Sequence, residues 1–417
     1  MTLTPFKINV PQRKLDAIRA QLELAEIGCA PEDDSSWKYG TDARYLSEFR
    51  DYWLGRYDWR RSEAELNRFP QFRARVEDID VHFYHVRGKG QNCFPIILTH
   101  GWPGSVFEFL EVIEPLTEAG YDLVIPSLPG YGFSSRPATP IGRRRVAYIW
   151  RRLMVDVLGY KRFGAQGGDW GSGVTRALAH DHADVVRAIH LNLIFYMNVV
   201  SDDPLLAAWR KTVAAVMARE GAYLYEQQTK PQTIALALST NPLAFAAWVL
   251  EKCNGWADTG GQIESRFTKD QLITNIMIYL VNDAIGSAIW LYHGAAKEEP
   301  SHNRIVVPTG FAAYPVEIIP PPPHHVAELE FNITRWTEVP SGGHFAAWEE
   351  PAAFAKEVAA FLPRTGEAAN LFEPFALRRL KYLLPGTKIS QYIVEYRHQD
   401  RPLFLVSQKV LSRHFQK

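Results

Sequence analysis

Gln166-Gly-Gly-Asp-Trp-Gly-Ser172 lies between a short apolar run at residues 162–166 and a stretch with the spacing of a helix. Glycine at positions 167, 168 and 171 surrounds Asp169, as a sharp turn from a strand into a helix requires. Turns of this form present a nucleophile, usually serine, and a carboxylate in its place can attack a saturated carbon. Asp169 is therefore the candidate nucleophile. The alternative is that it only caps the N-terminus of the helix.

A second turn follows the apolar run Phe94–Thr99 and reads His100-Gly-Trp-Pro-Gly-Ser105. A loop in this position can supply one backbone N–H of an oxyanion hole, and the residue after the nucleophile supplies the other. The predicted donors are Trp102 and Trp170. His100 itself is expected to orient the loop rather than to act as an acid or base. The alternative is an ordinary turn built on glycine and proline.

A third signal comes late in the chain, as Ser341-Gly-Gly-His-Phe-Ala-Ala-Trp-Glu-Glu-Pro351. A histidine framed by glycines suits the chain order nucleophile, acid, histidine. The acid should follow a strand, and Glu317 follows the apolar run 305–310. We predict a triad in which Glu317 orients His344 and His344 activates water for attack. Taken singly, His344 is one of 13 histidines and could be structural, and Glu317 could be a solvated surface residue.

Strands alternate with helices along two parts of the chain, which predicts an α/β fold with a mostly parallel central sheet and helices on both faces. Strand signals vanish between residues 197 and 300, where helical spacing favours a cap over the sheet. The predicted units are an N-terminal extension (1–90), the first part of the core (91–196), the helical cap (197–300), the second part of the core (301–365) and a C-terminal extension of unknown role (366–417).

Local patterns predict the individual elements. Residues 76–86 alternate as in one half-exposed strand. The strands expected in the core are 94–99, 121–126, 162–166, 186–193, 305–310 and 331–339, with helices at 146–158 and 351–362. In the C-terminal extension an approximate alternation would suit a hairpin with the run Leu403–Val406. The alternating residues are Ile389, Tyr392, Val394 and Tyr396.

Composition limits the classes of partner. The 417 residues include 46 basic and 46 acidic side chains, and 47% are hydrophobic, which favours a small uncharged partner over nucleic acid. Cys29, Cys93 and Cys253 are too scattered for a disulfide framework or a metal site. The sequence starts without the pattern of a signal peptide and lacks an apolar run of membrane-spanning length. We therefore expect a cytoplasmic protein without a membrane anchor.

Several motifs together carry a family resemblance. In the N-terminal part they are Pro5-Phe-Lys-Ile-Asn-Val-Pro11, Asp58-Trp-Arg60 and Leu66-Asn-Arg-Phe-Pro-Gln-Phe72. In the core they are His100-Gly-Trp-Pro-Gly-Ser105, Pro126-Ser-Leu-Pro-Gly-Tyr-Gly-Phe-Ser134, Gly167-Gly-Asp-Trp-Gly171, His190-Leu-Asn192 and Gly342-Gly-His-Phe-Ala-Ala347. On these motifs the chain from Pro5 to about Leu362 resembles the microsomal-type epoxide hydrolases, including their soluble fungal and bacterial members.

The resemblance implies an α/β-hydrolase fold and the hydrolysis of a small apolar epoxide to a vicinal diol, through an ester between the substrate and Asp169. It implies no metal or other cofactor, and it suggests roles in detoxification and aromatic hydrocarbon catabolism. Two cap tyrosines of the family donate hydrogen bonds to the epoxide oxygen. One matches Tyr292, and the other matches Tyr223, with Tyr225 close enough to stay an alternative. The Trp102-Pro103 peptide is expected to be cis, as in the family.

Two other functions stay open. Haloalkane dehalogenases share the aspartate nucleophile and the histidine but hold halide with tryptophan or asparagine donors, a role that Trp102 and Trp170 could take. A non-catalytic small-molecule binding protein could use the same scaffold, although it need not keep the whole predicted triad. The oligomeric state is open between monomer and homodimer. Residues 320–323 and the chain beyond residue 366 depart from the family pattern.

Overall fold

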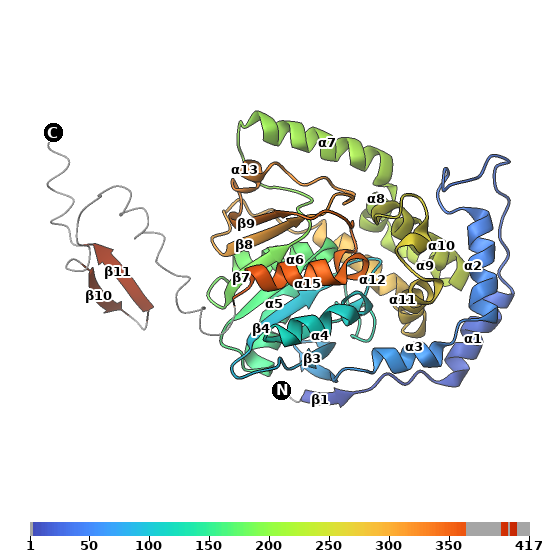
Figure 1. Ribbon diagram of the computed structural model, residues 1–417, viewed down its shortest axis with the longest axis horizontal. Helices are drawn as coiled ribbons and strands as arrows, with labels where there is room; N and C mark the ends of the chain where they lie inside the picture. Colours follow the sequence, from blue (N-terminus) through green and yellow to red (C-terminus); the bar gives the residue numbers. More distant parts are fainter. Residues whose placement is uncertain (1–2, 364–392, 399–400, 407–417) are drawn as a thin grey trace. The chain divides into compact units, whose positions relative to one another are not determined.

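The computed structural model describes residues 3–363, 393–398 and 401–406, and Figure 1 shows it as a ribbon. The contacts within the chain divide it into two units, Met1–Thr365 and Gly366–Lys417. The larger unit contains the central sheet, the helices around it and every residue of the predicted site.

The centre of the larger unit is a sheet of nine strands, counted over the described residues, in the order β1-β2-β3-β5-β4-β6-β7-β8-β9. The first three strands and the β3–β5 pair are antiparallel, whereas the strands from β5 to β9 in this order run parallel. The strands are β1 (Leu3–Phe6), β2 (Gln71–Val76), β3 (Ile79–Val86), β4 (Phe94–Thr99), β5 (Tyr121–Pro126), β6 (Phe163–Gly167), β7 (Val186–Leu191), β8 (Pro308–Ala313) and β9 (Asn332–Glu338).

Helices cover both faces of this sheet. Every residue of β4 and β5 is buried, as expected for parallel strands between two helical layers. Helices α4 (Leu110–Glu118) and α15 (Pro351–Phe361) pack together on one face, and α5 (Arg143–Arg152) and α6 (Asp169–Asp181) pack together on the other (Figure 1). The predicted architecture, a mostly parallel sheet between helices, is confirmed.

The described chain between β7 and β8 contains helices and no strand, and it forms the cap. Its helices are α7 (Pro204–Glu220), α8 (Ala222–Thr229), α9 (Pro231–Ser239), α10 (Pro242–Trp256), α11 (Lys269–Val281) and α12 (Ile285–Ala295). Over the described residues no single helix is long and apolar enough to cross a membrane. Only the pairs α9–α10 and α11–α12, bent by 118° and 85°, reach that length and composition together.

The N-terminal helices pack against the cap. They are α1 (Gln12–Glu23), α2 (Ala43–Gly55) and α3 (Trp59–Leu66), and the first two contact α10 and α11 (Figure 1). The hydroxyl of Thr41 donates to the carbonyl of Ala247 at 2.6 Å, and the hydroxyl of Tyr52 donates to Asp270 at 3.0 Å. These N-terminal helices therefore brace the cap. Two short helices, α13 (His324–Ala327) and α14 (Ala346–Glu349), complete the second part of the core.

Three predicted element boundaries were wrong. The strand predicted over 76–86 is divided, because residues 77 and 78 form the turn between β2 and β3. The strand predicted at 305–310 lies at 308–313. Residues 305–307 precede the strand and are apolar, as strand residues often are. Their side chains also alternate: Ile305 and Val307 are buried, and Val306 is 66% exposed. The helix predicted over 146–158 begins at Arg143 and ends in a π-helical turn, Leu153–Val157.

The smaller unit contains a hairpin. Strands β10 (Ile393–His398) and β11 (Arg401–Val406) pair antiparallel, with Val394 opposite Leu405. The hairpin predicted with the run 403–406 is confirmed over these strands. The remaining predicted residues of the hairpin, Ile389 and Tyr392, lie outside the described residues.

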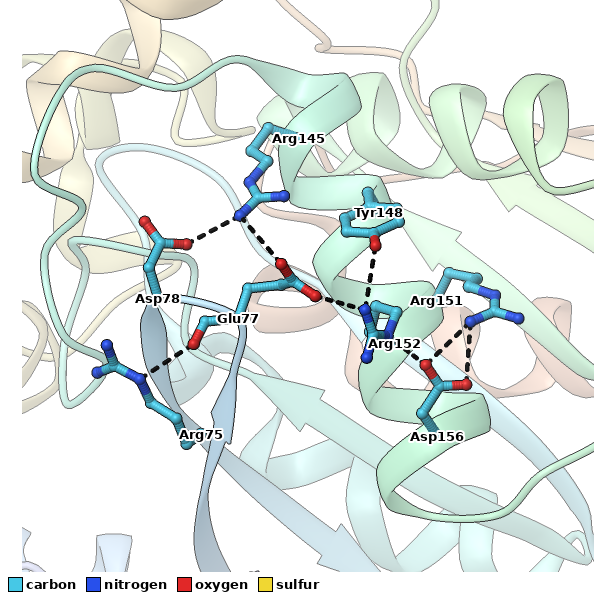
Figure 2. Close-up of polar contacts among 8 residues, drawn as sticks. All are labelled: Arg75, Glu77, Asp78, Arg145, Tyr148, Arg151, Arg152 and Asp156. Atoms are coloured by element: carbon cyan, nitrogen blue, oxygen red, sulfur yellow. Dashed lines mark hydrogen bonds and ion pairs between the residues drawn. The ribbon is translucent and has the colours of Figure 1, made fainter. Parts of the chain in front are cut away.

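Ion pairs tie the β2–β3 turn to helix α5, as Figure 2 shows. Arg145 contacts Asp78 at 2.9 Å and Glu77 at 3.9 Å, and Arg152 pairs with both Glu77 and Asp156. All of these side chains are partly exposed, so each pair contributes only about 0.2–1 kcal/mol. Of the two turn residues only Glu77 has a positive φ, 56°, the pattern of a type II′ turn, which favours glycine at this position.

We predict that the Glu77→Gly variant is more stable than Glu77→Ala by about 1 kcal/mol. Both variants lose the same ion pairs, but only glycine adopts the positive φ without strain. Urea denaturation of the two proteins side by side, followed by circular dichroism, measures the difference. Equal midpoints would mean that the turn takes up another conformation once the ion pairs are removed.

Candidate active site

Asp169 lies where the chain leaves β6 and enters α6. The N-cap of the helix is Gly168, and Asp169 is the first helical residue, with a φ of 45°. This left-handed backbone costs a residue with a side chain roughly 1–2 kcal/mol, and such strain collects at functional sites. The alternative in which Asp169 only caps α6 is wrong, because Gly168 is the cap and the Asp169 carboxylate is bonded to other segments.

The loop after β4 approaches the Asp169 carboxylate. The backbone N–H of Trp102 donates to Oδ1 of Asp169 at 2.8 Å. This approach depends on Gly101, since a Cβ at that position would lie 2.1 Å from the same oxygen. Trp170 directly follows Asp169, so its backbone N–H is among those at the start of α6 that have no partner within the helix. Both predicted oxyanion donors therefore lie beside the predicted nucleophile.

His100 holds this loop in place. Its Nδ1 donates to the carbonyl of Gly101 at 2.9 Å, and its Nε2 accepts from the backbone N–H of Leu128 at 3.1 Å. Burial lowers the pKa of His100 to about 4, so the ring is neutral at physiological pH. These bonds are those of a residue that orients the loop, as the sequence predicted. The Trp102–Pro103 peptide is cis, which is also as predicted.

His344 lies between two carboxylates. Its Nδ1 is 2.7 Å from Glu317 Oε1, and its Nε2 is 3.1 Å from Asp169 Oδ2. The side chains of His344 and Glu317 are each only 3% exposed. Glu317 follows β8, and a bridge between Val316 and Gly343 holds its segment against the His344 loop. The three residues of the predicted triad are therefore in contact.

The electrostatics of this group favour a charged histidine. Burial opposes a charge on His344, but the carboxylates of Glu317 and Asp169 outweigh it and hold its pKa well above the usual range. The position of His344 between the two carboxyl groups thus favours a proton on its imidazole. Removing the charge of Asp169 would remove one of the two anions that stabilise the proton on His344.

The cap contributes two buried phenols. Tyr223 on α8 and Tyr292 on α12 are 8% and 1% exposed, and both rings pack on Trp102, at centroid distances of 5.6 and 5.7 Å. Burial raises the pKa of both phenols well above the ordinary value, while a hydrogen bond from Tyr292 partly opposes this at Tyr223. Both are therefore neutral hydrogen-bond donors. Tyr225 is 54% exposed, so of the two candidates it is Tyr223 that faces the site.

A mostly apolar pocket lies between the phenols and the nucleophile. Asp169, His344, Tyr223 and Tyr292 line it together. The rest of its wall is apolar, formed by Trp170, Leu193, Phe195, Met217, Leu224, Ile318 and Ile319. A wall of this composition suits a small apolar molecule. Over the described residues no cluster of three or more histidine, cysteine, aspartate or glutamate side chains could hold a metal ion.

The cap also holds the histidine loop. The backbone N–H of His344 donates to the carbonyl of Trp256 at 3.0 Å, and the two rings lie 4.9 Å apart. Asp258 donates its N–H to Glu349 at 2.8 Å and accepts from the N–H of Gly342 at 3.1 Å. The sequence did not single out these contacts of Trp256, Asp258 and Glu349, because only folding brings residues 256–258 to the His344 loop.

Comparison with known proteins assigns the chain to a family. Residues 3–109 match the family described as Epoxide hydrolase N terminus, and residues 95–237 match the alpha/beta hydrolase fold. A Stigmatella aurantiaca protein named as an epoxide hydrolase is 39% identical over 373 residues, which cover 85% of this chain and 84% of the relative. The chain belongs to the epoxide hydrolase family.

Further epoxide hydrolases support this assignment. Epoxide hydrolase 1 of Sus scrofa is 31% identical over 405 residues, which cover 87% of this chain and 88% of the relative. The solved structure of Aspergillus niger epoxide hydrolase is 31% identical and superimposes with a TM-score of 0.78, over 87% of this chain and 96% of that one. The chain is accordingly that of a hydrolase enzyme, and the predicted α/β-hydrolase fold is confirmed.

We predict that Gly101→Ala lowers turnover of an epoxide by about 100-fold or more, because the new Cβ displaces the Asp169 carboxylate and misplacement by about 1 Å has effects of this size. Steady-state assays with styrene oxide measure the loss, and circular dichroism checks the fold. Gly55→Ala is the matched control, since a Cβ there meets nothing within 4 Å. Full activity of Gly101→Ala would show that this contact does not position the nucleophile.

Proposed function

We propose that this enzyme converts small apolar epoxides to vicinal diols through a covalent ester on Asp169. The observation that carries the proposal is the convergence on one pocket of a carboxylate, two neutral phenols and a histidine–glutamate pair. The carboxylate can attack a ring carbon, the phenols can stabilise the oxygen that leaves it, and the pair can activate water. Each of these groups thus has a role in the proposed reaction.

In the first half-reaction Oδ2 of Asp169 attacks one ring carbon. This oxygen is the one on the His344 side, whereas Oδ1 is already bonded to the N–H of Trp102 and becomes the carbonyl oxygen of the ester. The C–O bond of the ring breaks, and its oxygen, held by hydrogen bonds from Tyr223 and Tyr292, takes a proton from one of these two phenols and leaves a phenolate. The product of this step is a neutral hydroxyalkyl ester.

Ester formation prepares the second half-reaction. It converts the anionic Asp169 into a neutral ester, so His344 loses one of the two anions that raise its pKa. The imidazolium can then release its proton, which restores the phenol that protonated the ring oxygen, and the neutral imidazole acts as a base. Glu317 keeps the Nδ1 proton oriented toward itself, which leaves Nε2 free to accept a proton from water.

In the second half-reaction His344 removes a proton from water, and the hydroxide attacks the carbonyl carbon of the ester. The backbone N–H groups of Trp102 and Trp170 stabilise the oxyanion that forms on Oδ1. The intermediate collapses, the diol oxygen leaves with the proton from His344, and Asp169 is restored as a carboxylic acid. That acid returns its proton to His344, which regenerates the imidazolium between two carboxylates.

We predict that mutation separates the two half-reactions. Asp169→Ala should form no ester. His344→Gln should form the ester and then stall, with turnover reduced by about 1000-fold or more, because no base activates the water. Glu317→Gln should stall more mildly, since an amide can still orient the imidazole. Intact-protein mass spectrometry after brief exposure to styrene oxide should show one added substrate mass on His344→Gln, located to the peptide with Asp169. An unmodified His344→Gln protein that binds substrate would favour direct attack of water.

We predict that Tyr223→Phe and Tyr292→Phe each slow ester formation by about tenfold, the effect of losing one hydrogen bond to a developing charge, and leave ester hydrolysis nearly unchanged. The double variant should lose far more than either single one. Tyr225→Phe is the matched control, because that side chain is at the surface. Near wild-type turnover of the double variant would contradict these roles.

The same variants test the alternative that the protein is a haloalkane dehalogenase. In that reaction the leaving group is a halide, which needs no proton from a phenol. Release of chloride from chloroalkanes without diol from styrene oxide would favour this alternative, as would full activity of Tyr223→Phe on a chloroalkane.

A further inference from the structure

A second cavity adjoins the nucleophile. It shares Asp169 and His344 with the apolar pocket, but its other walls come from the core and include Thr99, Gln166 and Glu108. The phenols of the cap do not line it. The Asp169–His344 contact therefore separates an apolar pocket roofed by the cap from a more polar cavity within the core.

The polar walls of this second cavity call for a hydrogen-bonding occupant. Thr99 Oγ1 and Gln166 Oε1 belong to residues that are 0% and 1% exposed, and neither atom has a hydrogen-bond partner among the described residues. Buried polar atoms in proteins are nearly always bonded to protein or to water. The cavity has room for a water molecule.

Glu108 is placed in this cavity by the same loop that receives Asp169. A Cβ on Gly104 would lie 1.4 Å from Glu108 Oε1, just as a Cβ on Gly101 would lie 2.1 Å from Asp169 Oδ1. Two glycines three residues apart thus make room for two carboxyl groups beside His344. Nothing in the proposed ester mechanism uses the second of them.

The charge state of Glu108 suits this position. Burial raises its pKa to about 8, an effect that His344 opposes and that Asp169 reinforces, so the group is a neutral acid at pH 7. A hydrogen bond with the backbone of Ser105 lowers the pKa of Glu108 by less, and the charge of Glu349 raises it slightly. A neutral carboxyl group can bond to water without placing another anion beside Asp169.

We propose that this cavity binds the water that hydrolyses the ester, and that Glu108 holds this water against His344. The inference rests on the proposed ester mechanism. The water donates one hydrogen bond to the carbonyl oxygen of the Glu108 carboxyl group and the other to His344 Nε2. His344 takes that proton, the water oxygen forms its bond to the carbonyl carbon of the Asp169 ester, and the bond from that carbon to the diol oxygen breaks. Glu108 gains and loses no proton, so it is a positioning residue for the second half-reaction.

The test measures the two half-reactions separately. Rapid quenching of single turnovers with styrene oxide, followed by intact-protein mass spectrometry, gives the rates of ester formation and ester decay. For Glu108→Leu we expect formation within about twofold of wild type and decay slowed by about tenfold or more. Glu108→Gln keeps a polar group that can accept from water and should restore most of the decay rate. Glu111→Leu is the matched control, the same change at a side chain that is 63% exposed, and should alter neither rate.

Either of two results would overturn the proposal: unchanged ester decay in Glu108→Leu, or equal slowing of both steps. If Glu108→Leu does not fold, Thr99→Val decides, because it removes Oγ1 from the cavity wall with little change in volume. Slower decay with unchanged formation supports the water site, and unchanged decay contradicts it. Absence of any ester in His344→Gln would contradict the ester mechanism itself. The proposed role of Glu108 depends on that mechanism and would then be wrong as well.

Discussion

The carboxylate of Asp169, whose side chain is only 18% exposed, sets the requirements for the rest of the site. A carboxylate removed from water is costly unless hydrogen-bond donors and an opposite charge surround it. Trp102 supplies a donor from the loop after β4, and His344 supplies a cation from the loop after β9, itself oriented by Glu317 after β8. These loops meet because their strands run parallel in one sheet and so end at the same edge. The sheet order is therefore a condition for bringing these groups to Asp169.

The sequence predicted some of these site residues better than others, and the reasons are physical. Asp169 and His344 lie in glycine-rich turns, and such tight turns are compatible with few other structures at these positions. Glu317 followed from chain order, even though the strand before it was predicted three residues too early. Tyr223 and Tyr225 could not be separated, because both lie on one short helix and only the packing of α8 decides which of them is buried.

Other parts of the site carry no local signal. Glu108 looks like an ordinary acidic residue at the start of a helical segment, and its environment appears only when Gly104 and Asp169 are placed around it. Trp256 is nearly 90 residues from His344 in sequence, and its carbonyl could have bonded to many other groups. Such contacts result from long-range packing, so a single sequence predicts the general fold and the reacting groups better than it predicts what holds them.

The cap is fastened on two sides. The N-terminal helices hold it through Thr41 and Tyr52, and the core holds it through Trp256 and through the hydroxyl of Tyr279, which donates to the carbonyl of Gly104. Displacing the cap as a rigid body would break all of these bonds together. The outline of the apolar pocket is thus fixed when the chain folds. Regioselectivity, the choice of which ring carbon faces the nucleophile, becomes a property of side-chain shape, open to change at single wall positions while the reacting groups stay the same.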